Sequence, residues 1–213
     1  MISELRIEQT PGEPAVDLSG RSMLVTGASR GVGAATARIA ARRGADVAIN
    51  FRSKARRAEQ VAGDVRALGR SAVLAEADIT DRAAVRRMYE DVRDAFGRLD
   101  VLVLNASGGL EKDADEDYAM RLNRDAQLAL VQDAMPLMQP GSCVVFVTSH
   151  LAHFHGDKPV MPEYEPVARS KKAGEEALRG LLPALSAAGI RLAVVSGDLI
   201  EGTITPKLLD RMR

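Results

Sequence analysis

Three glycines near the start of the chain have the spacing of a phosphate-binding turn. They occupy positions 27, 31 and 33 of the segment Thr26-Gly-Ala-Ser-Arg-Gly-Val-Gly33. Glycine would permit the tight turn, the close approach of the backbone to a diphosphate, and flush packing of the next helix. The diphosphate would lie at the unpaired amides and the positive dipole end of that helix. A glycine-rich turn without a ligand is the alternative interpretation, because such a motif alone is not specific.

Alternating strand-like and helix-like segments surround this turn and would position it. Short apolar runs predict strands at 23–26, 46–50, 72–75, 101–104, 144–148 and 191–195. Helical periodicity predicts helices at 34–43, 54–68, 82–96, 115–138 and 167–188. This alternation predicts an α/β fold, a doubly wound parallel sheet with helices on both faces. We expect residues 1–20 to be a polar lead-in and residues 21–213 to form a single domain.

The composition narrows the classes of function. The 213 residues carry 29 basic and 29 acidic side chains, so no net charge draws the chain to nucleic acid or to a membrane. The single cysteine, Cys143, excludes an intrachain disulfide and fits a reducing compartment. The chain lacks a run of about 18 apolar residues and a signal-peptide pattern, so we expect a cytoplasmic protein. We expect no metal site, because His150, His153 and His155 crowd one loop without matching ligands.

The glycine segment, together with Asp17-Leu-Ser-Gly-Arg21 and Asn105-Ala-Ser-Gly108, resembles the short-chain dehydrogenase/reductase family. The resemblance covers residues 17–203 in the right order. It implies a Rossmann-like domain, homo-oligomeric assembly, and hydride transfer between a nicotinamide dinucleotide and a small carbonyl or alcohol substrate. The residues that it places around the cofactor are Gly27, Ser29, Arg30, Gly31, Val32, Gly33, Asp78, Ile79, Asn105, Ala106, Ser107 and Gly108.

The end of the second predicted strand indicates which nicotinamide cofactor is preferred. An NAD enzyme usually places an acidic residue there to hold the ribose 2′-hydroxyl. This sequence instead has Asn50, Arg52 and Ser53, with Arg30 in the glycine turn. Two guanidinium groups suit a 2′-phosphate and no carboxylate repels it, so NADP(H) is favoured over NAD(H). If Arg52 only begins a solvated helix, the preference stays open.

The same resemblance implies a set of catalytic residues. Reduction of a carbonyl needs an acid for the developing alkoxide, and a tyrosine beside a lysine ammonium can supply it. Ser149 and Asn123 match the serine and the asparagine of the family in context. Lys171 matches its lysine, which would also hold the nicotinamide ribose, and the tyrosine would be Tyr164.

The position of this tyrosine departs from the family pattern. Val167 stands four residues before Lys171, where the family has tyrosine, and Tyr164 stands seven residues before it. Seven helical residues span about 10.5 Å, too far for direct contact. Pro166 favours the first helical position and biases Glu165 away from helix, so Tyr164 is expected to precede the helix. Tyr164 could then fold back toward Lys171; the alternative is an altered or lost proton relay.

Beyond the sixth predicted strand, the nicotinamide-end residues of the family correspond to Gly197 and Thr203, with Ile200 between them. The chain ends at Arg213, where family members continue for several tens of residues. We therefore expect either a piece of a longer protein, lacking the last strand and the substrate lid, or an unusually small lid. The three histidines either pack within their loop or line the substrate pocket.

Two functions from different classes stay open. The first is an NADP(H)-dependent oxidoreductase in which Asn123, Ser149, Tyr164 and Lys171 act on a carbonyl or an alcohol. The second is a catalytically weakened protein that binds the dinucleotide as a sensor or a scaffold. The displaced tyrosine and the early end of the chain motivate this second hypothesis.

Overall fold

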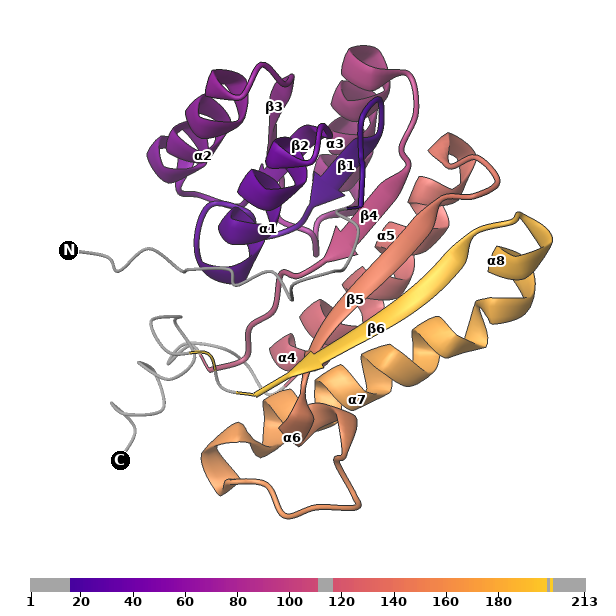
Figure 1. Cartoon of the computed structure of the whole chain (residues 1–213). Helices are drawn as coiled ribbons and strands as arrows, with labels where there is room; N and C mark the ends of the chain where they lie inside the picture. Colours follow the sequence, from indigo (N-terminus) through magenta and orange to yellow (C-terminus); the bar gives the residue numbers. More distant parts are fainter. Residues whose placement is uncertain (1–15, 111–116, 199, 201–213) are drawn as a thin grey trace.

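Six parallel strands form the centre of the molecule (Figure 1). The computed structural model describes residues 16–110, 117–198 and 200. The strand order is β3-β2-β1-β4-β5-β6, and every neighbouring pair is parallel. This arrangement confirms the predicted doubly wound sheet. The strands are β1 (Ser22–Val25), β2 (Asp46–Phe51), β3 (Ala72–Glu76), β4 (Val101–Leu104), β5 (Cys143–Ser149) and β6 (Arg191–Gly197).

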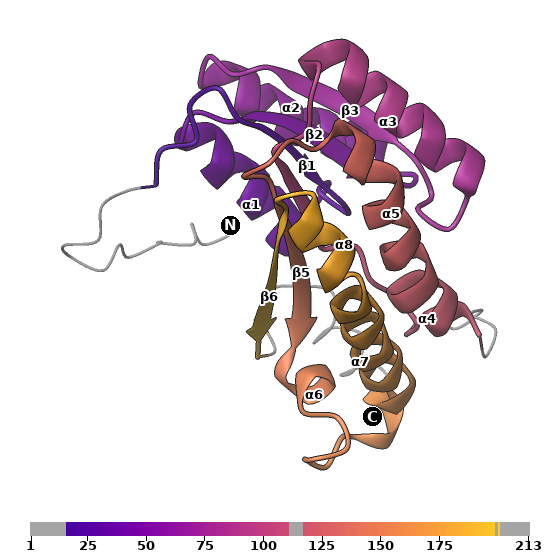
Figure 2. The same ribbon diagram turned by 90° about the vertical axis from the view of Figure 1, so that its right-hand side faces the viewer.

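Helices cover both faces of the sheet, as the sequence predicts (Figure 2). Apolar residues of α1 (Gly31–Arg42) and α2 (Ala55–Ala67) pack with Val25 and Val103 in one core cluster. The opposite face carries α3 (Arg82–Phe96), α5 (Ala126–Ala134), α7 (Glu165–Gly180) and α8 (Leu182–Ala187). These helices pack in a second cluster with Leu24 and Leu102. Successive residues of β1 and β4 thus enter different clusters, so both central strands are buried on two sides.

Two helices predicted as single segments are interrupted. The part of 115–138 that the structure describes contains α4 (Tyr118–Met120), a π-helical turn η1 (Arg121–Asp125), α5, and a 3₁₀ turn η2 (Met135–Leu137). The helix predicted at 167–188 begins earlier, at Glu165, and is divided into α7 and α8. Pro136 lies in η2 and Pro183 lies at the start of α8. Proline lacks the N–H that a continuing helix requires, which explains both of these breaks.

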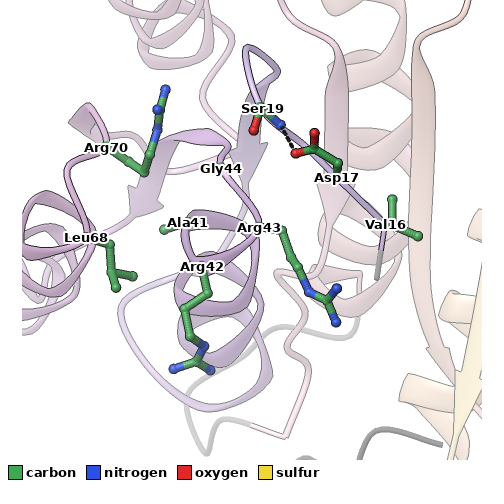
Figure 3. A pocket seen from close by; sticks show the side chains of 9 residues that line it. All are labelled: Val16, Asp17, Ser19, Ala41, Arg42, Arg43, Gly44, Leu68 and Arg70. Carbon is green, nitrogen blue, oxygen red and sulfur yellow. Dashed lines mark hydrogen bonds between the residues drawn. The ribbon is translucent and has the colours of Figure 1, made fainter. Parts of the chain in front are cut away.

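The described part of the lead-in, residues 16–20, packs on the end of α1 near the amino ends of the strands. Leu18 N donates a hydrogen bond to Arg43 O at 2.7 Å. An open hollow beside this contact is lined in part by Arg42, Arg43 and Arg70 (Figure 3). Figure 3 shows the Arg70 guanidinium directed away from the other two, so the three groups do not converge on one point. The hollow lies near the amino ends of the strands, whereas the glycine turn follows the carboxyl end of β1.

A buried carboxylate joins the amino ends of the two central strands. Asp100, directly before β4, accepts hydrogen bonds from Ser22 N and from the guanidinium groups of Arg21 and Arg98, each at 2.9 Å. Burial alone would raise the pKa of Asp100, but these hydrogen bonds lower it below its ordinary value. The carboxylate is therefore ionised in the folded protein and holds β4 against β1.

Asp100→Ala should lower the free energy of unfolding by about 2 kcal/mol, because it leaves the buried Ser22 N–H without this acceptor while both arginines rehydrate. The folded pKa of Asp100 lies below the unfolded one, so its contribution is complete above the unfolded pKa and is lost as the pH falls through the folded pKa. Urea denaturation of both proteins across a pH series measures this loss. Asp94→Ala, at an exposed position of α3, should change stability by less than about 0.5 kcal/mol. Equal losses in the two variants would contradict the role of Asp100.

Candidate functional site

The carboxyl ends of β1 and β4 meet where the strand order reverses. The Thr26 hydroxyl joins the two loops that follow these strands, since its Oγ1 accepts hydrogen bonds from Asn105 N and Ala106 N, both at 2.9 Å. Asn105 Nδ2 donates in turn to Thr26 O at 2.8 Å. The two loops predicted to bind the nucleotide are therefore held together at the topological switch point. Open α/β sheets bind their ligands at this place.

The three glycines of the first loop meet two steric requirements. Gly27 and Gly31 have φ values of 64° and 56°, a region that other residues rarely adopt. A Cβ on Gly33 would lie 2.6 Å from Asn105 Nδ2 and 2.7 Å from Gly27 O, so only glycine lets α1 approach the loop this closely. No side chain caps α1 at Arg30, and its first turn holds no acidic residue. Its first amides and positive dipole end therefore fit a diphosphate.

Asn50 supports this loop from β2. Its Oδ1 accepts a hydrogen bond from Gly27 N at 3.2 Å, and its Nδ2 donates to Ala75 O at 3.0 Å and to Ala77 O at 3.1 Å. Only 2% of Asn50 is exposed. Both amide hydrogens are used inside the protein, which leaves Asn50 no donor for a cofactor. The sequence predicts a direct contact between Asn50 and the cofactor, whereas in the structure its side chain supports the loop. No motif marks this role, because the partners of Asn50 are backbone atoms.

Arg52 lies at the outer end of the site between two other elements. Its Nη1 donates to Tyr118 Oη at 2.9 Å and lies 3.8 Å from Asp78 Oδ2. The structure thus brings together two of the predicted cofactor residues, Arg52 and Asp78. Tyr118 is an addition that sequence reasoning missed, because it lies 66 residues away on α4 and belongs to no recognised motif.

The other predicted cofactor residues lie in or beside these loops and differ in how exposed they are. Ile79 is 5% exposed and packs in the core, so only its backbone can face a ligand. Arg30, Ser53 and Ser107 are exposed. Those half-buried at the loops are Ser29, Val32, Asn105, Ala106 and Gly108.

A π-helical turn places Asn123 between the loop after β4 and α7. Such turns inside helices are frequent at functional sites. Asn123 Nδ2 donates hydrogen bonds to Gly108 O at 2.9 Å and to Ser170 Oγ at 3.0 Å. Its backbone carbonyl packs on Gly174, where any Cβ would clash with it. The Asn123 side chain therefore holds the loop to the helix that carries Lys171, and its part in a proton relay stays a prediction.

The hydroxyls of Ser149 and Tyr164 form a hydrogen bond of 3.1 Å. Ser149 ends β5 and caps the short helix α6 (His150–His153), accepting from Ala152 N at 3.2 Å. Tyr164 ends the 3₁₀ turn η3 (Pro162–Tyr164) and is the N-cap of α7, so it precedes that helix, as the sequence predicts. Burial raises the pKa of Tyr164, and the hydrogen bond with Ser149 offsets part of this effect. Tyr164 thus stays protonated and can act as an acid.

Lys171 does not pair with this tyrosine. Lys171 is 7% exposed, and within the described part of the chain its ammonium makes no hydrogen bond or ion pair. Burial lowers the pKa of Lys171 to about 8. The effect expected from the lysine, a lowered pKa of Tyr164, is absent.

The start of α7 explains the separation of these two residues. Glu165 is helical, with φ −52° and ψ −48°, although it precedes Pro166. The predicted bias of Glu165 away from helix is therefore wrong. In the first turn of a helix the missing N–H of proline has no intrahelical partner to lose, which permits this start. Lys171 consequently lies two full turns along α7 from Tyr164.

The residues predicted at the nicotinamide end are described in part. Gly197 ends β6 directly beside Ser149 in the parallel ladder. Ile200 is 43% exposed. Thr203 lies outside the described residues.

Two of the three histidines after β5 contact carboxylates of α7. His153 Nδ1 lies 2.8 Å from Glu175 Oε2, and His155 Nε2 lies 2.7 Å from Glu165 Oε1. These contacts favour packing within the loop over a place in the substrate pocket. Among residues 16–110 and 117–198, no group of three or more His, Cys, Asp or Glu side chains could hold a metal ion. The described helices include none with the length and apolar character needed to cross a bilayer.

Comparison with known proteins places the chain in a family. The model of the family "short chain dehydrogenase" matches residues 21–212. Hydroxynaphthalene reductase arp2 of Aspergillus fumigatus is 39% identical over 138 residues, which are 62% of this chain and 50% of that protein. A hydroxynaphthalene reductase-like protein of Metarhizium guizhouense is 34% identical over 79% of this chain and 62% of its own length. The chain thus spans only 50% and 62% of these two curated relatives.

Solved structures agree in fold. A short chain dehydrogenase from Burkholderia cenocepacia in complex with NADP has a TM-score of 0.77 and 36% identity, covering 85% of this chain and 75% of that one. The landomycin C-6 ketoreductase LanV with bound NADP and rabelomycin has a TM-score of 0.74 and 28% identity, over 86% and 78%. An NADH-dependent reductase responsible for alginate metabolism has a TM-score of 0.76 and 26% identity, over 88% and 80%. With this fold, this switch-point site and a family match along the whole domain, the chain belongs to the short-chain dehydrogenase/reductase family.

Proposed function

We propose that this protein is an NADP(H)-dependent oxidoreductase that transfers hydride between the nicotinamide and a carbonyl or alcohol substrate. The observation that carries the proposal is the hydrogen-bonded pair of Ser149 and Tyr164 hydroxyls at the carboxyl end of the sheet. Such a pair can hold and protonate a carbonyl oxygen. Membership in the family supports it, as does the uncapped start of α1 beside the glycine loop. We further propose that residues 21–213 hold this activity in a cytoplasmic homo-oligomer.

The protein residues supply the proton and the orientation, while the bound cofactor supplies the hydride. Ser149 Oγ donates a hydrogen bond to the carbonyl oxygen, and Tyr164 Oη gives its proton to that oxygen as negative charge develops. The hydrogen bond between the two hydroxyls places their oxygens together before substrate binds, and one hydrogen must then turn toward the carbonyl oxygen. Lys171, with a pKa of about 8, is mainly protonated at pH 7. Its ammonium makes no contact with Tyr164 but can hold a hydroxyl of the nicotinamide ribose.

We propose fused-ring aromatic carbonyl compounds as the substrate class. Two similar proteins support this choice, because one is named as a hydroxynaphthalene reductase and another is solved with rabelomycin. The test is NADPH consumption with 9,10-phenanthrenequinone as a fused-ring dicarbonyl probe. Oxidation of NADPH that depends on both enzyme and quinone is expected. Turnover of small aliphatic ketones alone would overturn the substrate class but keep the reaction type.

Arg52→Ala should weaken NADPH binding about tenfold and leave NADH binding within about twofold, since an exposed guanidinium contributes roughly 1.5 kcal/mol to a phosphate contact. Arg86→Ala, which removes the same charge from an exposed position of α3, is the matched control and should leave both affinities unchanged. Cofactor fluorescence titration measures all four dissociation constants. Equal affinity of the unmodified protein for both cofactors, or tighter binding of NADH, would show that Arg52 does not select a 2′-phosphate.

A nucleotide-binding sensor or scaffold is the second candidate. The missing contact between Lys171 and Tyr164 favours it, because the tyrosine lacks the cation that would ease its ionisation. This candidate requires NADPH binding without oxidation of NADPH by any carbonyl probe. The two assays above therefore separate the candidates directly.

A further inference from the structure

A buried carboxylate on α7 lies outside the mechanism described above. Glu175 stands one helical turn beyond Lys171, and its side chain is 3% exposed. Its Oε1 accepts two hydrogen bonds from Arg179, Nε at 3.0 Å and Nη2 at 2.8 Å. Burial alone would raise the pKa of Glu175, but hydrogen bonds from His153 and Arg179 lower it. An ionised carboxylate is costly to bury unless it is well bonded, so its partners indicate what it is for.

The second oxygen of this carboxylate holds His153. The Nδ1–Oε2 distance is 2.8 Å, and because an ionised carboxylate only accepts, Nδ1 carries the hydrogen and donates it. Lys172, also on α7, donates from Nζ to the His153 backbone carbonyl at 2.9 Å. The Phe154 ring meets the His153 ring edge-on at a centroid distance of 4.9 Å. His153 is thus bonded to α7 at both its side chain and its backbone.

His153 is the last residue of α6, and Ser149 caps the first turn of the same helix. A helix of four residues has too few internal hydrogen bonds to hold its own position. The orientation of α6, and with it that of the Ser149 hydroxyl, therefore depends on contacts with α7. Ala152 contributes one such contact, since it packs in a small apolar cluster with Tyr164 and Ala168. The hydrogen bond between His153 and Glu175 contributes another, at the other end of the short helix.

We propose that His153 and Glu175 are positioning residues that fix the Ser149 hydroxyl against Tyr164. The path runs from Glu175 to the His153 ring, along α6 to its cap Ser149, and across to Tyr164 at the start of α7. The path thus begins on α7, the helix that also carries Lys171, and ends at the N-cap of the same helix. The expected effects on kcat rest on the proposed function, whereas the positioning of the Ser149 hydroxyl does not.

His153→Ala should lower kcat about tenfold to thirtyfold, since displacement of a catalytic group by a fraction of an ångström commonly costs this much. The dissociation constant of NADPH should stay within about twofold, because the glycine loop and α1 are untouched. His153→Asn places an amide N–H close to the position of Nδ1, so it should restore kcat to within about threefold of the unmodified enzyme. Glu175→Gln should fall between the two, since its single amide oxygen must serve both His153 and Arg179.

His155→Ala is the matched control, because His155 also pairs with a glutamate of α7, but this glutamate is 48% exposed and His155 lies outside α6. Its kcat should remain within about threefold. The assay is oxidation of NADPH by 9,10-phenanthrenequinone at saturating concentrations. An unchanged kcat in His153→Ala would overturn the proposal, and so would an Asn variant as slow as the Ala variant.

A second readout does not need turnover. In ¹³C-tyrosine-labelled protein the Cζ resonance of Tyr164, assigned with Tyr164→Phe, reports the hydrogen bond to Ser149. We expect it to shift in His153→Ala and to stay in place in His153→Asn and His155→Ala. If the unmodified protein reduced no carbonyl while these shifts appeared, the proposed function would fail and the positioning role would stand. An unmoved resonance in His153→Ala would overturn the positioning role whatever the activity.

Discussion

Tyr164→Phe should lower kcat for NADPH-dependent carbonyl reduction by about 10²-fold to 10⁴-fold, the usual contribution of a positioned general acid. The substitution removes the hydroxyl that lies 3.1 Å from Ser149 Oγ and leaves the ring in its buried cluster. Steady-state kinetics at saturating NADPH and quinone measure the effect. The cofactor should bind within about twofold of its original affinity, because Tyr164 contacts neither the glycine loop nor Arg52.

Tyr118→Phe is a matched control for this experiment. It removes a phenolic hydroxyl that bonds Arg52 at the outer end of the site, so it should leave kcat nearly unchanged. An active Tyr164→Phe enzyme would remove this hydroxyl from the mechanism. If the unmodified protein bound NADPH but never oxidised it, the sensor or scaffold function would take the place of the enzyme.

Gly33→Ala should weaken NADPH binding by about 100-fold or more, because the added methyl group overpacks the contact between α1 and the loop. The new methyl group would lie 2.7 Å from the Gly27 carbonyl oxygen and 2.6 Å from Asn105 Nδ2. The backbone oxygen cannot rotate away, so either α1 or the loop must move. In both cases the amides at the start of α1 leave the diphosphate.

Gly63→Ala separates this effect from the general consequences of adding a methyl group to a helix. Gly63 is an exposed helical glycine of α2, and a Cβ there meets nothing within 4 Å. The change should stabilise the protein slightly through helix propensity and leave NADPH binding intact. Fluorescence titration with circular dichroism as a folding check compares the two variants. Comparable affinities for NADPH in both would show that the close approach of α1 is not needed.

The sequence predicted what depends on local pattern. Six apolar runs separated by helical segments predicted a parallel sheet with helices on both faces. A strand that is buried on both sides needs such an apolar run, so the sheet is visible in the sequence. The glycine spacing located the loop at the switch point. The break at Arg121–Asp125 was missed, since a π-turn needs only one extra residue in an otherwise regular helix and leaves no break in hydrophobic periodicity.

Contacts between distant residues could not be inferred from one sequence. The Asn50 amide was assigned to the cofactor, whereas its partners are carbonyls of the neighbouring strand end. Tyr118 and Arg52 are far apart along the chain and meet only after folding. The spacing of Tyr164 and Lys171 left open whether the tyrosine folds back toward the lysine, and in the structure the two groups make no contact. The carboxylate partner of His153 could not be inferred because it lies 22 residues away, on another helix.

Ser149 has three roles, and a single substitution would disturb all of them at once. It ends a strand, caps a helix and forms a hydrogen bond with the Tyr164 hydroxyl. Replacing it with alanine would cost about 1 kcal/mol of capping in addition to the lost hydroxyl chemistry, so the measured defect would overstate its share in catalysis. Aspartate can accept the same capping hydrogen bond from Ala152 N but carries no hydroxyl proton when ionised, so Ser149→Asp would separate the two contributions.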